Sequence, residues 1–354
     1  MKNLKNLRKF WSNKKVFITG HTGFKGTWIC IILNFLHAKI YGYSLKPNKN
    51  SFFFKANILE FISSNTFGDI NNYKNLKKKI TASKASIIIH MAAQPLVLES
   101  YKYPKRTFET NVMGTLNLLE AVREIKTVKS IIIVTTDKVY KAKKSNSGYI
   151  ETDELWGSDP YSSSKVGTEI VTSTYIKSFF INTHLKNRVS TVRAGNVLGG
   201  GDDSKNRLIP DIHRSINKKK KLIIRNPNNI RPWQHVIEPL FGYLKLAKMQ
   251  FKGFDNNHYY WNFGPEQQNF KRVIDVVKLI NKKHNLNYKI KKQISVSETN
   301  ILKLKSLRAK KELKWQSKWN VDKTLIKIEE WNNLVKLGKS VKRICEKQIS
   351  DYLK

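Results

Sequence analysis

The side chains of Tyr161 and Lys165 can together act on an alcohol. They are four residues apart in a segment of helical periodicity, so both lie on one face of that helix. Lowering the pKa of a tyrosine from about 10 to about 7 requires about 4 kcal/mol. One cation at about 4 Å, in an effective dielectric constant of about 20, supplies about that amount. The resulting phenolate can accept the proton of a hydroxyl group while the carbon of that group loses a hydride.

The spacing of this pair is weak evidence by itself. About two such pairs are expected by chance in a lysine-rich chain with 14 tyrosines. Further pairs with the same spacing include Tyr73 and Lys77, Tyr101 and Lys105, and Tyr140 and Lys144. The 161/165 pair is the one that follows the fifth predicted strand and its loop, which is the order that an active site of this kind requires.

The segment Thr135–Tyr140 (TTDKVY) lies at the end of that fifth strand, where an open α/β sheet presents catalytic groups. A simple dehydrogenase or 4-epimerase needs only a hydroxyl there, such as that of Thr136, to orient its substrate. Asp137 and Lys138 add an acid and a base, which indicates a further proton transfer. Once C4 of a hexose is a ketone, the C5 proton is acidic and the C6 hydroxyl is a leaving group, so elimination needs one base and one acid. The alternative is a solvated strand end.

A glycine-rich turn, Thr19–Gly26 (TGHTGFKG), follows the first predicted strand and begins a helix. Glycines at these positions allow a tight turn, close approach of the backbone to a diphosphate, and close packing of helix on strand. The sequence therefore predicts a dinucleotide site, and its candidate residues in this turn are Gly20, Thr22, Gly23, Phe24, Lys25 and Gly26.

The second strand ends without the carboxylate that an NAD site usually carries about 20 residues after the glycine turn. The residues there are Tyr43, Ser44, Leu45 and Lys46, and Lys46 could meet the 2′-phosphate of NADP. This motif therefore leaves NAD and NADP both open. After a weak third strand, Asp69 and Ile70 are candidates for the adenine edge of the site, with a surface turn as the alternative.

Short apolar runs alternate with longer periodic segments in the first half of the chain, which is typical of a parallel sheet flanked by helices. The predicted strands are Val16–Thr19, Lys39–Tyr43, Ser86–His90 and Ser130–Thr135, and the predicted helices include Thr107–Ile125 and Ser162–Phe179. From about Val189 the pattern changes to a further strand, Val189–Arg193, then glycines at 199–201 and mixed short segments with scattered prolines.

This pattern predicts an α/β fold with a doubly wound parallel (Rossmann) sheet and a smaller mixed α/β C-terminal domain. We expect residues 1–188 to form the dinucleotide-binding domain with the catalytic residues. Residues 189–354 are expected to form mainly the substrate-binding domain, with parts of 189–265 returning to the sheet. The two domains should share a cleft.

Composition excludes several classes of protein. With 354 residues, 40% hydrophobic and 11% aromatic, the chain is neither fibrous nor wholly disordered, and its length predicts about two domains. Its two cysteines, Cys30 and Cys345, cannot form a disulfide framework, which favours a reducing compartment, and we expect the cytoplasm. No run approaches the roughly 18 apolar residues of a membrane span, and the basic N-terminus lacks the long apolar region of a signal peptide.

The formal charge is +40, from 66 basic and 26 acidic residues, and it raises the possibility of nucleic-acid binding. The excess is mostly Lys, is spread along the chain and accompanies abundant Asn and Ile, as a codon bias towards A and T would produce. We therefore expect no nucleic-acid partner. The positive field would still favour an anionic ligand such as a nucleotide sugar.

Nine short motifs carry a family resemblance that extends from Phe10 to about Trp319. They are Thr19–Gly26, His90–Pro95, Thr110–Thr115, Thr136–Lys138, Asp159–Tyr161 with Lys165, Arg193–Val197, Arg207–Asp211, Arg231–Val236 and Trp261–Pro265. Together they resemble the extended short-chain dehydrogenase/reductases, and within these the CDP-glucose 4,6-dehydratases. Lys138 is the most specific residue, because relatives that act on dTDP-glucose carry two acids here.

The resemblance implies that CDP-D-glucose is converted into CDP-4-keto-6-deoxy-D-glucose and water with NAD as cofactor, for the dideoxyhexoses of bacterial surface polysaccharide such as the O-antigen of lipopolysaccharide. Tyr161 would deprotonate the C4 hydroxyl as NAD accepts the C4 hydride, with Thr136 holding the sugar and Lys165 anchoring the ribose. Lys138 would remove the C5 proton and Asp137 protonate the departing C6 hydroxyl before the hydride returns to C6. As a base, Lys138 must be substantially neutral.

The resemblance also assigns ligand-binding residues and a partner. The cofactor would be held by the glycine turn with Asp69, Ile70, Ala92, Ala93, Tyr161 and Lys165, and the substrate by Gln94, Asn196, Arg207, Arg225 and Arg231, without a metal. Relatives form homodimers through four-helix bundles, so Thr107–Ile125 and Ser162–Phe179 are the candidate interface. The chain departs from the family at Leu98, where an Arg is usual, and at Lys314, where a Gly is common.

Two alternatives stay open. A nucleotide-sugar 4-epimerase, or a 4,6-dehydratase that acts on another nucleotide, would share most of these motifs, although Asp137 and Lys138 argue against the epimerase. A non-catalytic nucleotide- or nucleic-acid-binding protein would bind polynucleotides in a salt-sensitive way and turn over no sugar.

Overall fold

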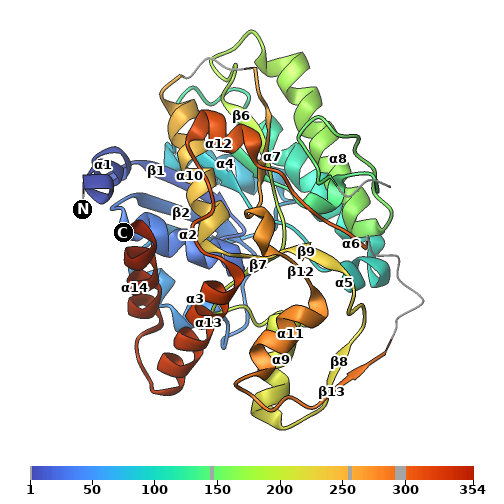
Figure 1. The fold of residues 1–354 in the computed structure, drawn as a ribbon. Helices are drawn as coiled ribbons and strands as arrows, with labels where there is room; N and C mark the ends of the chain where they lie inside the picture. The colour runs from blue at the N-terminus through green and yellow to red at the C-terminus, as the bar shows by residue number, and fades with distance from the viewer. Residues whose placement is uncertain (1, 144–146, 254–256, 292–299) are drawn as a thin grey trace.

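The computed structural model describes residues 2–143, 147–253, 257–291 and 300–354. Its centre is a seven-stranded sheet in the order β11-β6-β5-β4-β1-β2-β3, and every neighbouring pair is parallel (Figure 1). The strands are β1 Lys15–Thr19, β2 Lys39–Ser44, β3 Ser64–Phe67, β4 Ile87–His90, β5 Ser130–Val134, β6 Val189–Ala194 and β11 Tyr260–Phe263. The strand order reverses between β1 and β4, and in such a sheet ligands bind outside the carboxyl ends of the strands at this reversal.

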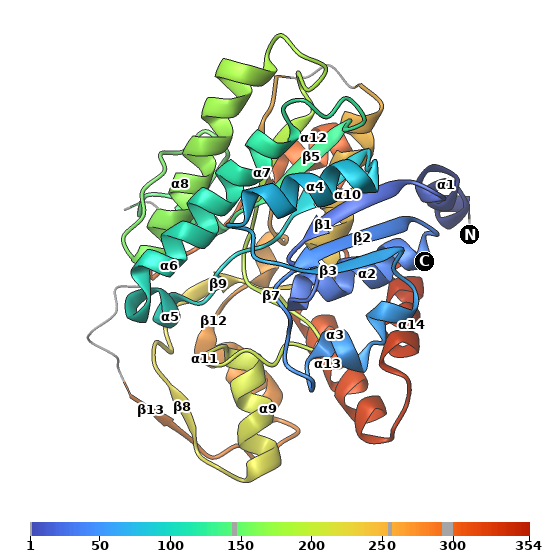
Figure 2. The ribbon, with the colours of Figure 1, turned by 180° about the vertical axis from the view of Figure 1, so that it is seen from behind.

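Helices cover both faces of the sheet (Figures 1 and 2). The α-helices of the described residues, including those of a smaller lobe, are α1 Lys2–Trp11, α2 Phe24–Phe35, α3 Phe52–Lys55, α4 Tyr73–Ser83, α5 Val97–Lys102, α6 Pro104–Phe108, α7 Gly114–Val122, α8 Pro160–Tyr175, α9 Leu208–Lys218, α10 Ile237–Phe251, α11 Val273–Asn281, α12 Leu307–Leu313, α13 Val321–Lys336 and α14 Val341–Leu353. None of the helices within the described ranges is long and apolar enough to cross a bilayer.

Alternate side chains of the strands enter two separate cores. Val16 and Ile18 of β1 pack into the core that contains α2, α10 and α14, whereas Phe17 packs into the core of α4 and α7. Side chains of a strand point to opposite faces in turn, and both faces are covered at the centre of the sheet, so the central strands β4 and β5 contain continuous apolar runs rather than alternating ones. The doubly wound parallel fold expected from the sequence is therefore confirmed.

The two long helices expected from the sequence are each continued by one π-helical turn. The first runs through α6, the π segment Glu109–Met113 and α7, and the second through α8 and the π segment Ile176–Phe180. Helix α8 begins earlier than expected because Asp159 caps it: its Oδ1 accepts hydrogen bonds from the backbone of Tyr161 (2.9 Å) and of Ser162 (3.0 Å). This cap fixes Tyr161 in the first turn of the helix.

Residues after 189 contribute to two regions. Strands β6 and β11 and helix α10 belong to the layers of the main sheet, and α14 packs against α2. A smaller lobe contains α9, α11 and three two-stranded sheets, with its own apolar core. These sheets pair β7 Val197–Leu198 with β10 Gln234–His235, β8 Leu222–Ile224 with β13 Tyr288–Ile290, and β9 Ile230–Pro232 with β12 Phe270–Arg272. The domain boundary between 188 and 189 stays a prediction.

Candidate active site

Two adjoining pockets open at the carboxyl edge of the sheet. The glycine-turn pocket, of about 740 Å³, lies over the ends of β1, β2, β4 and β5. All twelve residues that were predicted to hold the cofactor line it: Gly20, Thr22, Gly23, Phe24, Lys25, Gly26, Asp69, Ile70, Ala92, Ala93, Tyr161 and Lys165. Four separate stretches of sequence therefore converge on one cavity.

The glycine turn has the shape that a diphosphate needs. Gly20 has φ +73, and a Cβ atom there would lie 2.6 Å from the backbone nitrogen of Ala92. A Cβ at Gly26 would lie 2.1 Å from the carbonyl oxygen of Gly20, so helix α2 can approach the turn only with glycine at this place. Phe24, Lys25 and Gly26 of the first turn of α2 line the pocket, and the N–H groups of a first helical turn have no partner within the helix, which suits an anion. These residues fit a bound dinucleotide.

The end of β2 offers hydroxyl groups in place of a carboxylate. The hydroxyl groups of Thr22 and Ser44 lie 2.8 Å apart, and Thr22 Oγ1 also donates to the carbonyl oxygen of Leu45 at 3.1 Å. Among the residues that the structure describes, Ser44, Leu45 and Asn48 line the pocket here and Lys46 does not. Lys46 is therefore poorly placed to meet a 2′-phosphate.

The second cavity, the arginine pocket, has about 270 Å³ and continues from the first. Lys25, Tyr161 and Arg207 line both cavities. Its basic lining residues are Lys25, Lys138, Lys205, Arg207, Arg225 and Arg231, and its acidic ones are Asp137, Asp202 and Asp211. This excess of cations suits a ligand with several negative charges, and the planar guanidinium groups suit phosphate oxygens.

Four of the five predicted substrate residues line the arginine pocket, namely Asn196, Arg207, Arg225 and Arg231. Gln94 is not among the described residues that do so. Its Nε2 donates to the carbonyl oxygen of Leu96 (3.1 Å) and to Thr107 Oγ1 (3.0 Å), and its Oε1 accepts from the Leu96 backbone (2.7 Å). These hydrogen bonds use the side-chain amide of Gln94 to stabilise the loop that carries Pro95 and Leu98. Both of these residues line the pocket.

The predicted acid and base lie together in a 3₁₀ turn at the end of β5. Thr136 Oγ1 accepts a hydrogen bond from the Lys138 backbone (3.3 Å) and lies 3.2 Å from Asp137 Oδ1. The side chain of Asp137 is buried, and its Oδ2 has no hydrogen-bond partner among the described residues. Burial raises the pKa of Asp137, although the charges of Lys138 and Arg231 oppose this effect. A carboxyl group that keeps its proton in this way can act as a general acid.

Tyr161 and Lys165 lie on the same face of α8, but their electrostatics differ from the expectation. Burial raises the pKa of Tyr161 to about 12, with a hydrogen bond to Thr136 and the charge of Arg207 opposing it. Burial and the nearby charge of Lys25 lower the pKa of Lys165 to about 7. The prediction that Lys165 alone lowers the pKa of Tyr161 to about 7 is therefore wrong for this structure, because burial outweighs a cation that is itself easily deprotonated.

Three features of the site were not found from the sequence. Lys25 was assigned to the cofactor but also lines the arginine pocket, and burial and the charge of Arg207 lower its pKa to about 8. Asp202 forms an ion pair with Arg207 at 3.3 Å. Glu169 makes a buried ion pair with Arg193 behind the end of β5. The position of Glu169, four residues after Lys165, was an available signal for the third feature, because it places both side chains on one helix face.

Comparison with known proteins agrees with this geometry. The family model described as GDP-mannose 4,6 dehydratase matches residues 17–328. The chain belongs to this family. It is 38% identical over 351 residues to the CDP-glucose 4,6-dehydratase of Salmonella typhimurium, covering 98% of each chain. It is 24% identical over 350 residues to the UDP-glucose 4-epimerase of Pisum sativum, covering 91% of this chain and 95% of the epimerase. The resemblance to 4,6-dehydratases that the motifs indicated is confirmed.

Solved structures show the same fold. The dTDP-glucose 4,6-dehydratase of Bacillus anthracis, solved in complex with NAD, has a TM-score of 0.75 at 22% identity and covers 90% of this chain and 96% of its own. The UDP-glucose 4-epimerase of Thermotoga maritima, solved with UDP-glucose, has a TM-score of 0.76 at 18% identity and covers 90% and 99%. At these identities the likeness supports the fold, and the chemistry has to be argued from the residues.

Proposed function

We propose that this protein is an NAD-dependent 4,6-dehydratase that converts CDP-D-glucose into CDP-4-keto-6-deoxy-D-glucose and water. The observation that carries the proposal is the Asp137–Lys138 pair at the end of β5, in the pocket that Tyr161 also lines. An epimerase needs the tyrosine but has no step for an adjacent acid and base. The 38% identity to a CDP-glucose 4,6-dehydratase over nearly the whole chain supports the same substrate.

Three side chains transfer protons in the proposed reaction, namely Tyr161, Asp137 and Lys138. Tyr161 accepts the proton of the C4 hydroxyl, and Thr136 orients that hydroxyl. Lys138 removes the C5 proton from the 4-keto sugar, and Asp137 protonates the C6 hydroxyl so that it leaves as water. Lys138 then returns a proton to C5 when the hydride adds to C6, which completes the 4-keto-6-deoxy sugar. The raised pKa of Asp137, which burial causes, supports its role as the acid. NAD, when bound, takes up the C4 hydride and returns it to C6, so that the cofactor is regenerated in each turnover.

The glycine-turn pocket is the proposed cofactor site. The N-terminus of α2 would hold the diphosphate, and the hydroxyl groups of Thr22 and Ser44 would meet the adenosine ribose. Lys165 would hold the other ribose, since its side chain lines this pocket. Because hydroxyl groups, and not a cation, lie at the end of β2, we favour NAD over NADP.

The arginine pocket is the proposed site of the nucleotide sugar. Arg207, Arg225 and Arg231 would bind the diphosphate, and Asn196 would lie beside the sugar or the diphosphate. Leu98, which replaces the arginine usual in the family, lines this pocket and leaves one wall apolar. Its effect would be on affinity and not on the proton transfers.

Turnover of a panel of nucleotide sugars tests the proposal. With NAD, we expect CDP-glucose to give a 4-keto-6-deoxy sugar at a kcat/KM at least about tenfold above UDP-, dTDP- or GDP-glucose, since a polar base-recognition contact is worth at least about 1.4 kcal/mol. Mass spectrometry after reduction with borodeuteride identifies the product. Formation of CDP-galactose would support an epimerase. Preference for another nucleotide would overturn the proposal that CDP-glucose is the substrate. Salt-sensitive polynucleotide binding without turnover would overturn the proposal that the protein is an enzyme.

A homodimer is the proposed assembly. Several large apolar side chains are exposed on the helical layer of α6, α7 and α8, which Figure 2 shows side by side: Phe108, Met113, Ile170, Phe179 and Ile181, each 40–59% exposed. Exposed apolar side chains on neighbouring helices favour burial against a partner. Light scattering should report twice the chain mass of 41.2 kDa, and Ile170→Glu should shift the protein towards the mass of one chain. A monomer in the unchanged protein would contradict this assembly.

The cytoplasm is the proposed location, in keeping with synthesis of an activated sugar for surface polysaccharide. Cys30 and Cys345 are buried free thiols in the structure. Such thiols persist most readily in a reducing compartment.

A further inference from the structure

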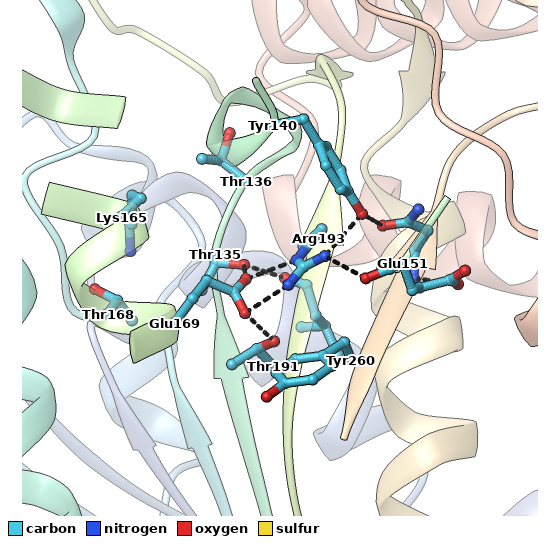
Figure 3. A network of polar contacts seen from close by, with 12 residues as sticks. Thr135, Thr136, Tyr140, Glu151, Lys165, Thr168, Glu169, Thr191, Arg193 and Tyr260 are labelled. Atoms are coloured by element: carbon cyan, nitrogen blue, oxygen red, sulfur yellow. Dashed lines mark hydrogen bonds and ion pairs between the residues drawn. The ribbon is translucent and has the colours of Figure 1, made fainter. Parts of the chain in front are cut away.

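A buried ion pair joins helix α8 to strand β6 directly behind the candidate catalytic residues (Figure 3). The side chains of Glu169 and Arg193 are each 1% exposed. Glu169 Oε1 accepts hydrogen bonds from Thr135 Oγ1 (2.6 Å) and Arg193 Nε (2.8 Å), and Oε2 accepts from Thr191 Oγ1 (2.6 Å) and Arg193 Nη2 (2.9 Å). Four donors therefore saturate the carboxylate, as a buried charge requires.

Arg193 also connects the ion pair to Tyr140. Its Nη1 donates to Tyr140 Oη (2.9 Å) and to the Glu151 carbonyl oxygen (3.2 Å). Tyr140 Oη donates in turn to Asn262 Oδ1 (2.7 Å). The ring of Tyr140 stacks on Tyr149, with centroids 4.8 Å apart and an angle of 7° between the planes. The tyrosine is thus held by both its hydroxyl group and its ring.

The charges of this network are stable over a wide range of pH. Burial would raise the pKa of Glu169, but the charge of Arg193 and the hydrogen bonds hold it below its usual value. Burial would lower the pKa of Arg193, but Glu169 and Tyr140 keep it above its usual value. Breaking such a pair leaves an uncompensated buried charge, so the arrangement is rigid.

Thr135 and Tyr140 are the two ends of the segment that carries Thr136, Asp137 and Lys138. One end is bound to Glu169 and the other to Arg193, so a single ion pair fixes both ends of the turn. Glu169 also lies one helical turn after Lys165 and two turns after Tyr161. The same pair therefore fixes the turn relative to the helix that carries the phenol.

We propose that Thr135 and Tyr140 are positioning residues for elimination: through the Glu169–Arg193 pair they hold Asp137 and Lys138 at the sugar. Tyr140 lines neither pocket in the described part of the chain, whereas Thr135 lines both, with its hydroxyl group donating to Glu169 Oε1 (2.6 Å). The inference rests on the proposed dehydratase function and adds a role that the motifs do not assign. Since catalytic groups act only within a few tenths of an ångström of their productive place, loosening this turn should slow the step that uses it.

Tyr140→Phe tests the proposal. The variant keeps the ring and its stacking on Tyr149, and removes the bonds to Arg193 and Asn262. Rapid chemical quench with CDP-glucose, followed by borodeuteride trapping, separates unreacted sugar, CDP-4-ketoglucose and the dehydrated product. We expect the rate constant of elimination to fall about 10–100-fold, as a displacement of about 1 Å causes. The rate constant of C4 oxidation and the KM should stay within about threefold, so that CDP-4-ketoglucose accumulates.

Tyr149→Phe is the matched control. It removes the other hydroxyl of the stacked pair, which accepts a bond from the Lys143 backbone (3.2 Å) and has no part in the ion-pair network. Both rate constants should stay within about threefold of the unchanged protein. Equal losses in the two variants, or equal slowing of oxidation and elimination in Tyr140→Phe, would overturn the proposal.

If Tyr140→Phe fails to fold, Thr135→Val tests the same proposal. It removes the donor at the other end of the turn with a side chain of the same shape, and the same selective slowing of elimination is expected. Unchanged elimination in a folded Thr135→Val would overturn the proposal. Failure of the unchanged protein to dehydrate CDP-glucose would instead refute the proposed function, so the two failures are distinguishable.

Discussion

Lys138→Ala is expected to abolish the dehydration of CDP-glucose and to leave NAD binding intact. Lys138 supplies the base that removes the C5 proton, and loss of a general base costs about 10²–10⁴ in rate. Its side chain lines the arginine pocket and is not among the described residues of the glycine-turn pocket, so the cofactor site is unaffected. Product formation is followed by mass spectrometry, and NAD binding by titration calorimetry. Quenched samples should contain CDP-4-ketoglucose, because oxidation at C4 does not use this lysine.

Lys141→Ala is the control for charge. Lys141 lies three residues further along the same segment and pairs with Glu154 at 2.8 Å in an exposed position. An exposed pair contributes at most about 1 kcal/mol, so activity should be retained. If Lys138→Ala still dehydrated CDP-glucose at the original rate, Lys138 could not be the base and the division of roles with Asp137 would be wrong.

Local sequence signals were sufficient for the sheet and for the glycine turn. Apolar runs such as Ile87–Ile89 have no polar face to leave in water, so they specify strands buried on both sides. The glycines at 20 and 26 are required by contacts at 2.6 and 2.1 Å that no side chain permits. A short motif therefore fixes both the backbone path and the ligand that can approach it. The glycine motif and the family resemblance together predict the residues from Gly20 to Lys165 that line this cavity.

The roles of other polar side chains depend on hydrogen-bond partners that the sequence does not identify. Gln94 stands beside the pocket in sequence, but Thr107 and the Leu96 backbone take up its amide group. The carboxylate of Glu169 is defined by Thr135, Thr191 and Arg193, and no spacing rule connects these three residues. The hydrogen-bond partners of polar side chains depend on the three-dimensional arrangement of the chain. Their roles can therefore be assigned only once the fold is known.

The pKa of Tyr161 is the clearest example of a property that residue spacing in the sequence does not predict. A lysine four residues away predicts stabilisation of the phenolate, and this argument assumes that the lysine stays charged. In the fold both groups are buried, and each loses part of its preference for the charged form. The pKa of Tyr161 also depends on a hydrogen bond to Thr136 and on the charge of Arg207, which come from other elements and oppose the effect of burial.

Tyr161→Phe is expected to lower turnover of CDP-glucose by about 10²–10⁴-fold, the usual cost of removing a general base. In contrast to Lys138→Ala, this variant should yield no trapped CDP-4-ketoglucose, because the first step, oxidation at C4, already needs the phenol. The phenyl ring keeps the packing of Tyr161, so the fold should be retained. Tyr175→Phe, on the same helix, is the control: its hydroxyl group bonds Glu120 at 2.9 Å, away from both pockets. It should turn over CDP-glucose normally.

The pH dependence of kcat/KM tests the role of Tyr161 as the base in an independent way. A base must lose its proton to act, and burial raises the pKa of Tyr161 to about 12 in the free protein. The reactive phenolate is then a minor form near neutrality, and its fraction grows about tenfold for each pH unit. The kcat/KM of the unchanged protein should therefore rise with pH above neutrality, and the residual rate of Tyr161→Phe should lose this rise. A variant that kept the original slope would show that another group takes the C4 proton, and Thr136 or Lys165 would then have to be the base.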